Sequence, residues 1–146
     1  MTVKLQNEVP NFKFKSTAGT SQLSDYRGKQ VVIYFYPKDS TPGCTIESKG
    51  FAEFHDEFVK ANTVIFGISK DSMASHDKFK AKHNMPFELI SDEDTSICQL
   101  FDVIREKSMF GKKYMGIERS TFIIDPKGTL IKEWRKVKVN GHSDEV

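Results

Sequence analysis

The chain has 146 residues, a length that suits one hydrophobic core. We therefore expect a single domain over residues 1–146. Its 22 basic and 20 acidic residues leave a formal net charge of +2, which gives no reason to expect a nucleic acid or an anionic membrane as a partner. The N-terminal residues have neither the basic nor the apolar segment of a secretory signal, and no stretch approaches transmembrane length.

Two cysteines, Cys44 and Cys98, lie 54 positions apart and form no C-x-x-C motif. The sequence therefore predicts neither a zinc site nor a dithiol motif, and it gives no sign of a disulfide scaffold. A reducing compartment, the cytoplasm, is the default for such a chain. We expect no cofactor and no metal, because the four histidines share no spacing typical of metal ligands: His55, His76, His83 and His142.

The N-terminal part of the chain has the pattern of a β-hairpin followed by a buried strand. Asn11 to Lys15 alternates apolar and polar residues, Thr20 to Leu23 does so more weakly, and Ala18-Gly19 between them is a turn signal. Val31 to Tyr36 (VVIYFY) is an apolar run of β-branched and aromatic residues with the length of a strand.

A helix is expected after this strand, from the residues around Cys44 to about Asn62. Its aromatic residues recur at spacings of three and four, as one helix face requires: Phe51, Phe54 and Phe58. Cys44 falls in the first turn, where unpaired backbone amides and the aligned peptide dipoles favour a thiolate over a thiol. A thiolate is a nucleophile. The alternative role of Cys44 is that of a small buried apolar residue.

The middle of the chain alternates strands and helices. Val64 to Ser69 and Phe87 to Ile90 are predicted strands, and each is followed by a helix that starts near an aspartate or a serine cap. Apolar residues mark the buried sides of these helices, with Met73 and Phe79 on the first and Ile97, Leu100 and Phe101 on the second.

The last third of the chain adds a second hairpin. Glu106 to Ile117 holds two glycines around a lysine pair and is predicted to be a mobile loop or an irregular hairpin. Arg119 to Asp125 and Leu130 to Val137 are predicted strands joined by the turn Pro126-Lys127-Gly128. Residues 141–146 resemble the start of a helix, so we expect a C-terminal helix to be missing or truncated. This order of elements indicates an α/β protein with a mixed central sheet flanked by helices.

The segment Pro37 to Cys44 (PKDSTPGC) has the form P-x-x-x-T-x-x-C, and Arg119 follows far downstream. In this the chain resembles the peroxiredoxins. YFYPKDSTPGCTIE, LISDEDTSICQLFDV and FGKKYMGIERSTFIID are similar to the Q-type branch, also called the bacterioferritin comigratory protein group, over about Val9 to Val146. The resemblance implies a thioredoxin-like fold and a thiol peroxidase that reduces hydrogen peroxide and organic hydroperoxides through a cysteine sulfenic acid.

The resemblance also implies a role for each residue of the motif. Cys44 would be the peroxidatic cysteine, Thr41 would hydrogen-bond the peroxide, and Pro37 would shield the site from water. Arg119 would donate several N–H bonds to thiolate and peroxide, and the backbone amide of Gly43 would complete the substrate cradle. These roles suit displacement on oxygen, which needs a deprotonated sulfur, an aligned peroxide and donors for the leaving oxygen. Taken singly, Thr41 could be a helix cap, Pro37 a strand terminator and Arg119 a surface charge.

One position departs from the Q-type pattern. Many members carry a resolving cysteine five positions after the peroxidatic one, and Lys49 stands there in this chain. We therefore expect a one-cysteine cycle in which thioredoxin, glutaredoxin or a small thiol reduces the sulfenic acid of Cys44. The alternative is an atypical two-cysteine cycle that uses Cys98, which requires the two Cα atoms to come within about 7 Å after local unfolding. Otherwise Cys98 is a helix residue half in the core.

Other classes of function fit the residues less well. A disulfide reductase of the thioredoxin type needs a second cysteine three residues after Cys44, where Glu47 stands. A redox-sensing or holdase module remains an alternative, although a pure sensor has no need of Thr41 and Arg119. We expect a monomer or a weak homodimer.

Overall fold

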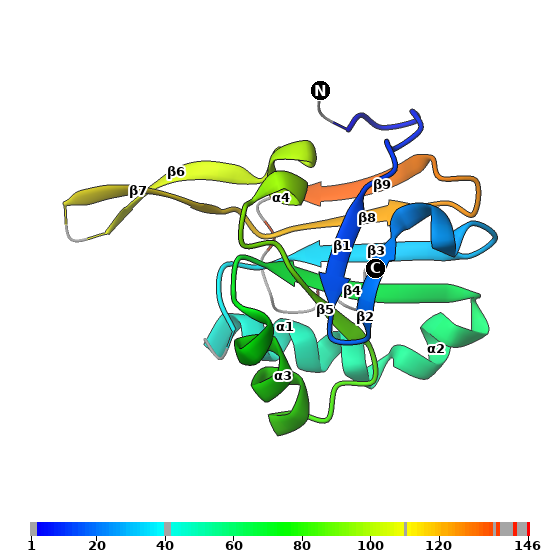
Figure 1. The fold of residues 1–146 in the computed structure, drawn as a ribbon, viewed down its shortest axis with the longest axis horizontal. Coiled ribbons are helices and arrows are strands. Elements are labelled where there is room, and N and C mark those ends of the chain that lie inside the picture. Colours follow the sequence, from blue (N-terminus) through cyan, green and yellow to red (C-terminus); the bar gives the residue numbers. More distant parts are fainter. Residues whose placement is uncertain (1–2, 40–41, 110, 136, 138–141, 143–145) are drawn as a thin grey trace.

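The computed structural model describes residues 3–39, 42–109, 111–135, 137, 142 and 146. In this part of the chain, seven strands form one sheet in the order β2-β1-β5-β4-β3-β8-β9 (Figure 1). Its strands in chain order are β1 (Lys13–Ser16), β2 (Gly19–Gln22), β3 (Gln30–Phe35), β4 (Thr63–Ser69), β5 (Glu88–Ser91), β8 (Ser120–Ile124) and β9 (Leu130–Arg135). The helices are η1 (Leu23–Tyr26, a 3-10 helix), α1 (Pro42–Glu53), α2 (His55–Lys60), α3 (Met73–Lys82) and α4 (Ser96–Leu100).

The sheet is mixed, as predicted. Strand β3 pairs in parallel with β4, and β4 pairs in parallel with β5, because helices connect these strands. The predicted hairpins supply the antiparallel parts: β1 pairs with β2 and β5, and β8 pairs with β3 and β9. Each predicted strand is present, with bounds within two residues of those expected. The α/β class and the N-terminal hairpin are thus confirmed.

The two faces of the sheet bury separate apolar clusters. Successive residues of a strand point to opposite faces of the sheet. Helices or loops cover both faces at β3, so its side chains are buried on both. Val31, Ile33 and Phe35 belong to one cluster, with α4 and the N-terminal hairpin. Val32, Tyr34 and Tyr36 belong to the other, with α1 and α3. The faces are named here after these helices, as the α4 face and the α1 face.

The predicted helix from Cys44 to Asn62 is wrong in one respect, because the chain bends at Phe54. Helix α1 ends before this residue and α2 begins after it, and the backbone of Phe54 has left helical geometry with φ −95° and ψ 9°. Both helices have an aromatic ring on the α1 face. Phe51 is fully buried and stacks on Tyr34 with 4.7 Å between ring centroids, and Phe58 packs beside it. Burial of one phenylalanine contributes roughly 2 kcal/mol.

The segment predicted as a loop or an irregular hairpin is a regular antiparallel ribbon. Strands β6 (Ile104–Met109) and β7 (Lys112–Ile117) pair in register over six positions and project away from the main sheet (Figure 1). Gly111 has φ +78° at the turn, a conformation that glycine adopts without steric cost. The base is fixed because Ile117 is buried in the core. Motion of this ribbon stays a prediction.

The C-terminal expectations fall mostly outside the described residues. Of residues 138–146, only His142 and Val146 are described, and the amide of Val146 donates to the carbonyl of His142. The buried His142 packs its ring against Phe51 of α1 and Trp134 of β9. Among the described residues, no helix is both long and apolar enough to cross a membrane.

Candidate active site

The start of β8 and the segment that leads into α1 lie at the same end of strand β3. Strand β3 ends at Phe35, whose partner in the antiparallel β8 is Ser120, so Arg119 lies beside the point where the chain leaves β3. Helix α1 begins at Pro42, and Cys44 is in its first turn, as predicted. The fold therefore brings together two residues that are 75 positions apart in sequence.

The side chain of Arg119 is held against α1 by Glu47. Arg119 Nη1 donates to Glu47 Oε1 at 3.0 Å, and the Glu47 side chain is fully buried while that of Arg119 is 18 % exposed. Glu47 follows Cys44 by three residues, and residues at this spacing share a face of a helix. The pair thus holds a permanent positive charge at the helix face on which Cys44 lies.

Glu47 has an unusual titration. Burial raises its pKa from 4.5 to about 7, although the charge of Arg119 and the hydrogen bond from it act in the opposite direction. Its second oxygen, Oε2, is buried without a hydrogen-bond partner among the described residues. In the sequence, Glu47 drew attention only because a disulfide reductase of the thioredoxin type would have its second cysteine at this position. Its position one turn after Cys44 was a usable signal, but its burial and its partner could not be seen in the sequence.

The remaining residues of the motif are described to different extents. Thr41 lies outside the described residues, and so does the side chain of Cys44. The backbone of Gly43 is in the first turn of α1, whose amides have no intrahelical acceptor. Pro37 is half-buried and directly follows the fully buried Tyr36. The roles expected for these residues remain predictions.

Cys98 lies in a buried environment next to a negative charge. It is fully buried in α4, more deeply than the half-buried position expected from the sequence, and its amide donates to Asp92 Oδ2 at 2.8 Å. Burial raises the pKa of the Cys98 thiol far above its usual value, and the negative charge of Asp92 raises it further. Cys98 packs on the α4 face, whereas Phe51 of α1 packs on the α1 face. The sheet therefore separates Cys98 from the buried side of α1.

One group among the described residues has the composition of a metal site. Potential ligand atoms of Asp39, Asp71 and His76 lie within 4.8 Å of one another. Sequence spacing could not reveal this group, because its members come from three segments. His76 Nδ1 lies 2.7 Å from Asp39 Oδ2, and Asp71 Oδ2 accepts the amide of Asp39, so hydrogen bonds inside the protein use these atoms. The expectation of no metal stays a prediction.

Comparison with known proteins places this chain among well-defined relatives. The model of the AhpC/TSA family matches residues 5–133. Peroxiredoxin Bcp of Bacillus subtilis is 52 % identical over 146 residues, which cover 99 % of this chain and 93 % of that protein. Peroxiredoxin Bcp of Escherichia coli K12 is 38 % identical over 145 residues, with the same coverage of both chains.

Solved structures agree with the fold. The bacterioferritin comigratory protein of Xanthomonas campestris, whose structures as trapped intermediate and ligand complexes concern alkyl peroxide reduction, has a TM-score of 0.87 and 49 % identity, covering 92 % of this chain and 86 % of that one. A cysteine variant of PrxQ from Xylella fastidiosa has a TM-score of 0.93 and 39 % identity, covering 99 % and 93 %. The thioredoxin-like fold implied by the resemblance is therefore confirmed.

Proposed function

Because this chain belongs to the AhpC/TSA family and is a thiol-dependent peroxidase of the Bcp peroxiredoxin group, we propose that Cys44 is the residue that attacks the peroxide. The observation that supports this most directly is the ion pair between Arg119 and Glu47, one turn after Cys44 on α1. A guanidinium in this place stabilises a thiolate and the charge that develops on a leaving oxygen. Thr41, Pro37 and the Gly43 amide complete the proposed site.

The proposed chemistry is a displacement on oxygen. The Cys44 thiolate attacks the terminal oxygen of the peroxide, so that an S–O bond forms while the O–O bond breaks. The attacked oxygen stays on the sulfur, and the other oxygen leaves with the electron pair of the O–O bond as hydroxide or alkoxide, which takes up a proton to become water or an alcohol. The sulfur is oxidised to sulfenic acid. Arg119 and the amides at the start of α1 stabilise the departing anion, and Thr41 aligns the peroxide.

The proposed recovery step uses an external thiol. A thiol of thioredoxin, glutaredoxin or a small molecule attacks the sulfenic sulfur, releasing water and forming a mixed disulfide with Cys44. A second thiolate then attacks that disulfide, which releases Cys44 as a thiolate and leaves the reductant oxidised. Two features favour this route over a two-cysteine cycle. Lys49 is exposed on α1 where many relatives carry a cysteine, and Cys98 is buried on the α4 face.

The substrate class and the setting are part of the same proposal. We propose hydrogen peroxide and organic hydroperoxides as substrates, since the Xanthomonas campestris relative is described in terms of alkyl peroxide reduction. A monomer or weak homodimer in the cytoplasm is the proposed state, and the free thiol of Cys98 suits a reducing compartment. The disulfide-reductase alternative loses support, because Glu47 in the position of its second cysteine is paired with Arg119.

Peroxide consumption in excess dithiothreitol tests this proposal. The wild-type protein should consume hydrogen peroxide catalytically, whereas Cys44→Ser and Arg119→Ala should both lose activity. Retained turnover in Cys44→Ser would show that another residue carries the reaction. Absence of turnover in the wild type, with Cys44 still oxidised once, would instead favour a sensor or holdase.

A further inference from the structure

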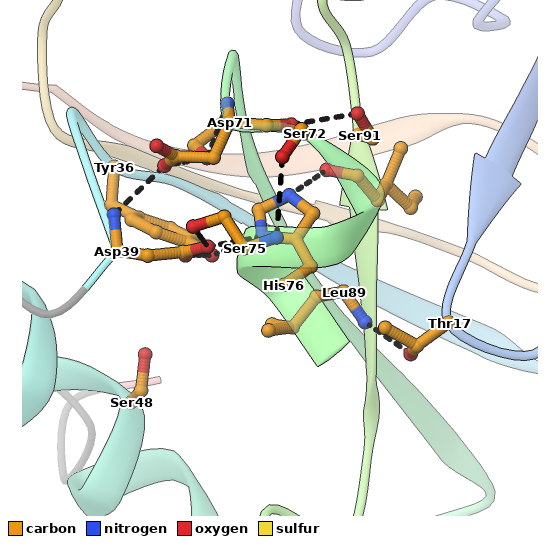
Figure 2. Close-up of polar contacts among 12 residues, drawn as sticks. Thr17, Tyr36, Asp39, Ser48, Asp71, Ser72, Ser75, His76, Leu89 and Ser91 are labelled. Atoms are coloured by element: carbon orange, nitrogen blue, oxygen red, sulfur yellow. Dashed lines mark hydrogen bonds and ion pairs between the residues drawn. The ribbon is translucent and has the colours of Figure 1, made fainter. Parts of the chain in front are cut away.

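Asp39 is a buried carboxylate for which the peroxidase chemistry described so far has no use. It lies between β3 and α1, five residues before Cys44, and is only 5 % exposed. Figure 2 shows three side chains converging on it. The hydroxyl of Tyr36 donates to Oδ1 at 2.6 Å, the hydroxyl of Ser75 donates to Oδ2 at 2.8 Å, and His76 Nδ1 lies 2.7 Å from the same Oδ2. Both carboxylate oxygens are therefore occupied.

Both ring nitrogens of His76 are held by hydrogen bonds. The ring is fully buried, and Nε2 lies 2.9 Å from the carbonyl oxygen of Ile90. A carbonyl oxygen only accepts, so Nε2 carries a hydrogen. Nδ1 lies 2.7 Å from Asp39 Oδ2, so a second hydrogen bond joins the ring to the carboxyl group. The two side chains thus form a buried hydrogen-bonded pair.

The backbone of Asp39 is tied to the same region. Its amide donates to Asp71 Oδ2 at 2.8 Å, and that oxygen also accepts from the hydroxyl of Ser69 at the end of β4. The carbonyl of Asp71 in turn accepts from Ser91 at the end of β5. Figure 2 shows Asp71 between these contacts. The chain before α1 is therefore bound to the ends of two neighbouring strands besides β3.

Tyr36 completes this arrangement at the end of β3. It is fully buried, and its backbone amide donates to the carbonyl of Ile68 on β4. Burial raises the pKa of Tyr36 well above its usual value, and the neighbouring Tyr34 and Asp39 raise it further. The hydroxyl is therefore a hydrogen-bond donor at every physiological pH. All the described donors hold Asp39 in one orientation.

We propose that the Asp39–His76 pair is a positioning element of the peroxidase, which fixes the chain between β3 and α1 relative to Cys44. This inference rests on the proposed role of Cys44. Pro37 lies two residues before Asp39, so fixing Asp39 restricts Pro37, and Thr41 follows Asp39 by two positions in the sequence. A buried pair of ionisable groups gives little net stability, because desolvation offsets the attraction between them, and its benefit here is a defined geometry. Displacement of a reacting group by about 1 Å can slow a reaction about 100-fold.

Two rates measured on Asp39→Asn separate positioning from stability. The first is the oxidation of Cys44 by hydrogen peroxide, followed by the fluorescence of Trp134, and the second is the alkylation of Cys44 by iodoacetamide, which requires a thiolate but no peroxide alignment. We expect oxidation to slow at least about 10-fold, with alkylation within twofold of wild type. The matched control is Asp92→Asn, which alters another buried carboxylate but one that binds the start of α4, and it should leave both rates within twofold.

Nitrogen NMR of the His76 ring provides an independent measurement. The Nδ1 signal should differ between the wild type and Asp39→Asn, because the substitution replaces the carboxyl group that contacts Nδ1. An unchanged Nδ1 signal would overturn the inference. So would wild-type oxidation in Asp39→Asn, an equal loss of both rates, or the same loss in Asp92→Asn.

If Asp39→Asn does not fold, two milder variants test the positioning role of Asp39. Tyr36→Phe and Ser75→Ala each remove one donor to Asp39, and each should slow oxidation more than alkylation, whereas wild-type rates in both would overturn the inference. Cys44→Ser separates this result from the proposed function. If that variant is still oxidised at the wild-type rate, the role of Cys44 is wrong. If it is not oxidised while the Asp39 variants behave as wild type, only the positioning role is wrong.

Discussion

The two cysteines of this chain occupy the same position in two helices, α1 and α4, which cover opposite faces of one sheet. Cys44 is the third residue of α1 and Cys98 is the third residue of α4, so both lie in a first turn. Near Cys44, Glu47 holds the guanidinium of Arg119 against the helix. At Cys98 the neighbouring charge is the carboxylate of Asp92, in a fully buried setting. A helix start alone therefore does not activate a thiol, because the adjacent charge and the access of water decide its ionisation.

Exchange of each cysteine for serine gives the largest expected contrast. Cys44→Ser should lower the rate of peroxide reduction by a factor on the order of 10³ or more, because the nucleophile is removed. Cys98→Ser should leave the rate of the first oxidation within twofold. Competition for hydrogen peroxide with a second peroxidase measures both rates. Similar losses in the two variants would contradict the distinction between the sites.

Removal of the charge near Cys44 should have the next largest effect. Arg119→Ala should slow oxidation of Cys44 by about 10² to 10³, the range seen when a donor to a developing oxyanion is lost. Arg119→Lys is the matched control, since it keeps the charge but not the planar donor group, and it should recover part of the rate. Stopped-flow mixing with hydrogen peroxide measures both variants. Full activity in Arg119→Ala would exclude the guanidinium from the site.

Glu47 should make stability depend on pH. Its folded-state pKa of about 7 lies above the unfolded value of 4.5, so the folded state binds a proton more tightly. The free energy of unfolding should therefore fall as pH rises from about 4.5 to about 7, by about 3 kcal/mol in total, and then level off. Glu47→Gln should remove this slope. Urea unfolding at pH 5 and pH 8 measures it, and an identical slope in both proteins would contradict the assignment.

The smallest effect is expected for Cys98 in multiple turnover. With thioredoxin as reductant, Cys98→Ser should keep its steady-state rate within about twofold. The Cys98 thiol is buried on the α4 face and does not take part in the proposed one-cysteine cycle. Steady-state consumption of peroxide and a mass spectrum after one equivalent of peroxide check this. A collapse of turnover with a fast first oxidation, or a disulfide between Cys44 and Cys98, would identify Cys98 as the resolving residue.

The sequence predicted the helices and strands that depend on local patterns of residues. The apolar run Val31–Tyr36 and the turn at Pro126-Lys127-Gly128 identified strands, and Cys44 was correctly placed in the first turn of a helix. The regular pairing of β6 with β7 was missed, because glycines at both ends of a polar segment also suit a loop. The interruption at Phe54 was missed as well, because Phe51, Phe54 and Phe58 keep the spacing of one continuous helix.

The site was predictable only where a motif marks it. Pro37, Thr41, Cys44 and Arg119 came from one pattern, whereas Glu47 and Asp39 looked like ordinary polar residues of a helix and a loop. Their importance follows from burial and from partners that are distant in sequence. Glu47 contacts Arg119 across 72 positions, and Asp39 contacts His76 across 37. Contacts of this kind depend on the complete fold.

The interruption of the helix at Phe54 also separates two segments, α1 and α2, that can open independently. A helix opens as a unit, because each turn supports the next through the hydrogen-bond ladder. Phe54 departs from helical geometry, so opening of α1 from its first turn can stop there, and the clusters around β3 keep Phe58 of α2 and the α4 face in place. Opening that begins at the first turn of α1 therefore involves a segment of 12 residues. Exchange should be similar among the hydrogen-bonded amides of α1 and change at Phe54, whereas the first-turn amides should exchange faster.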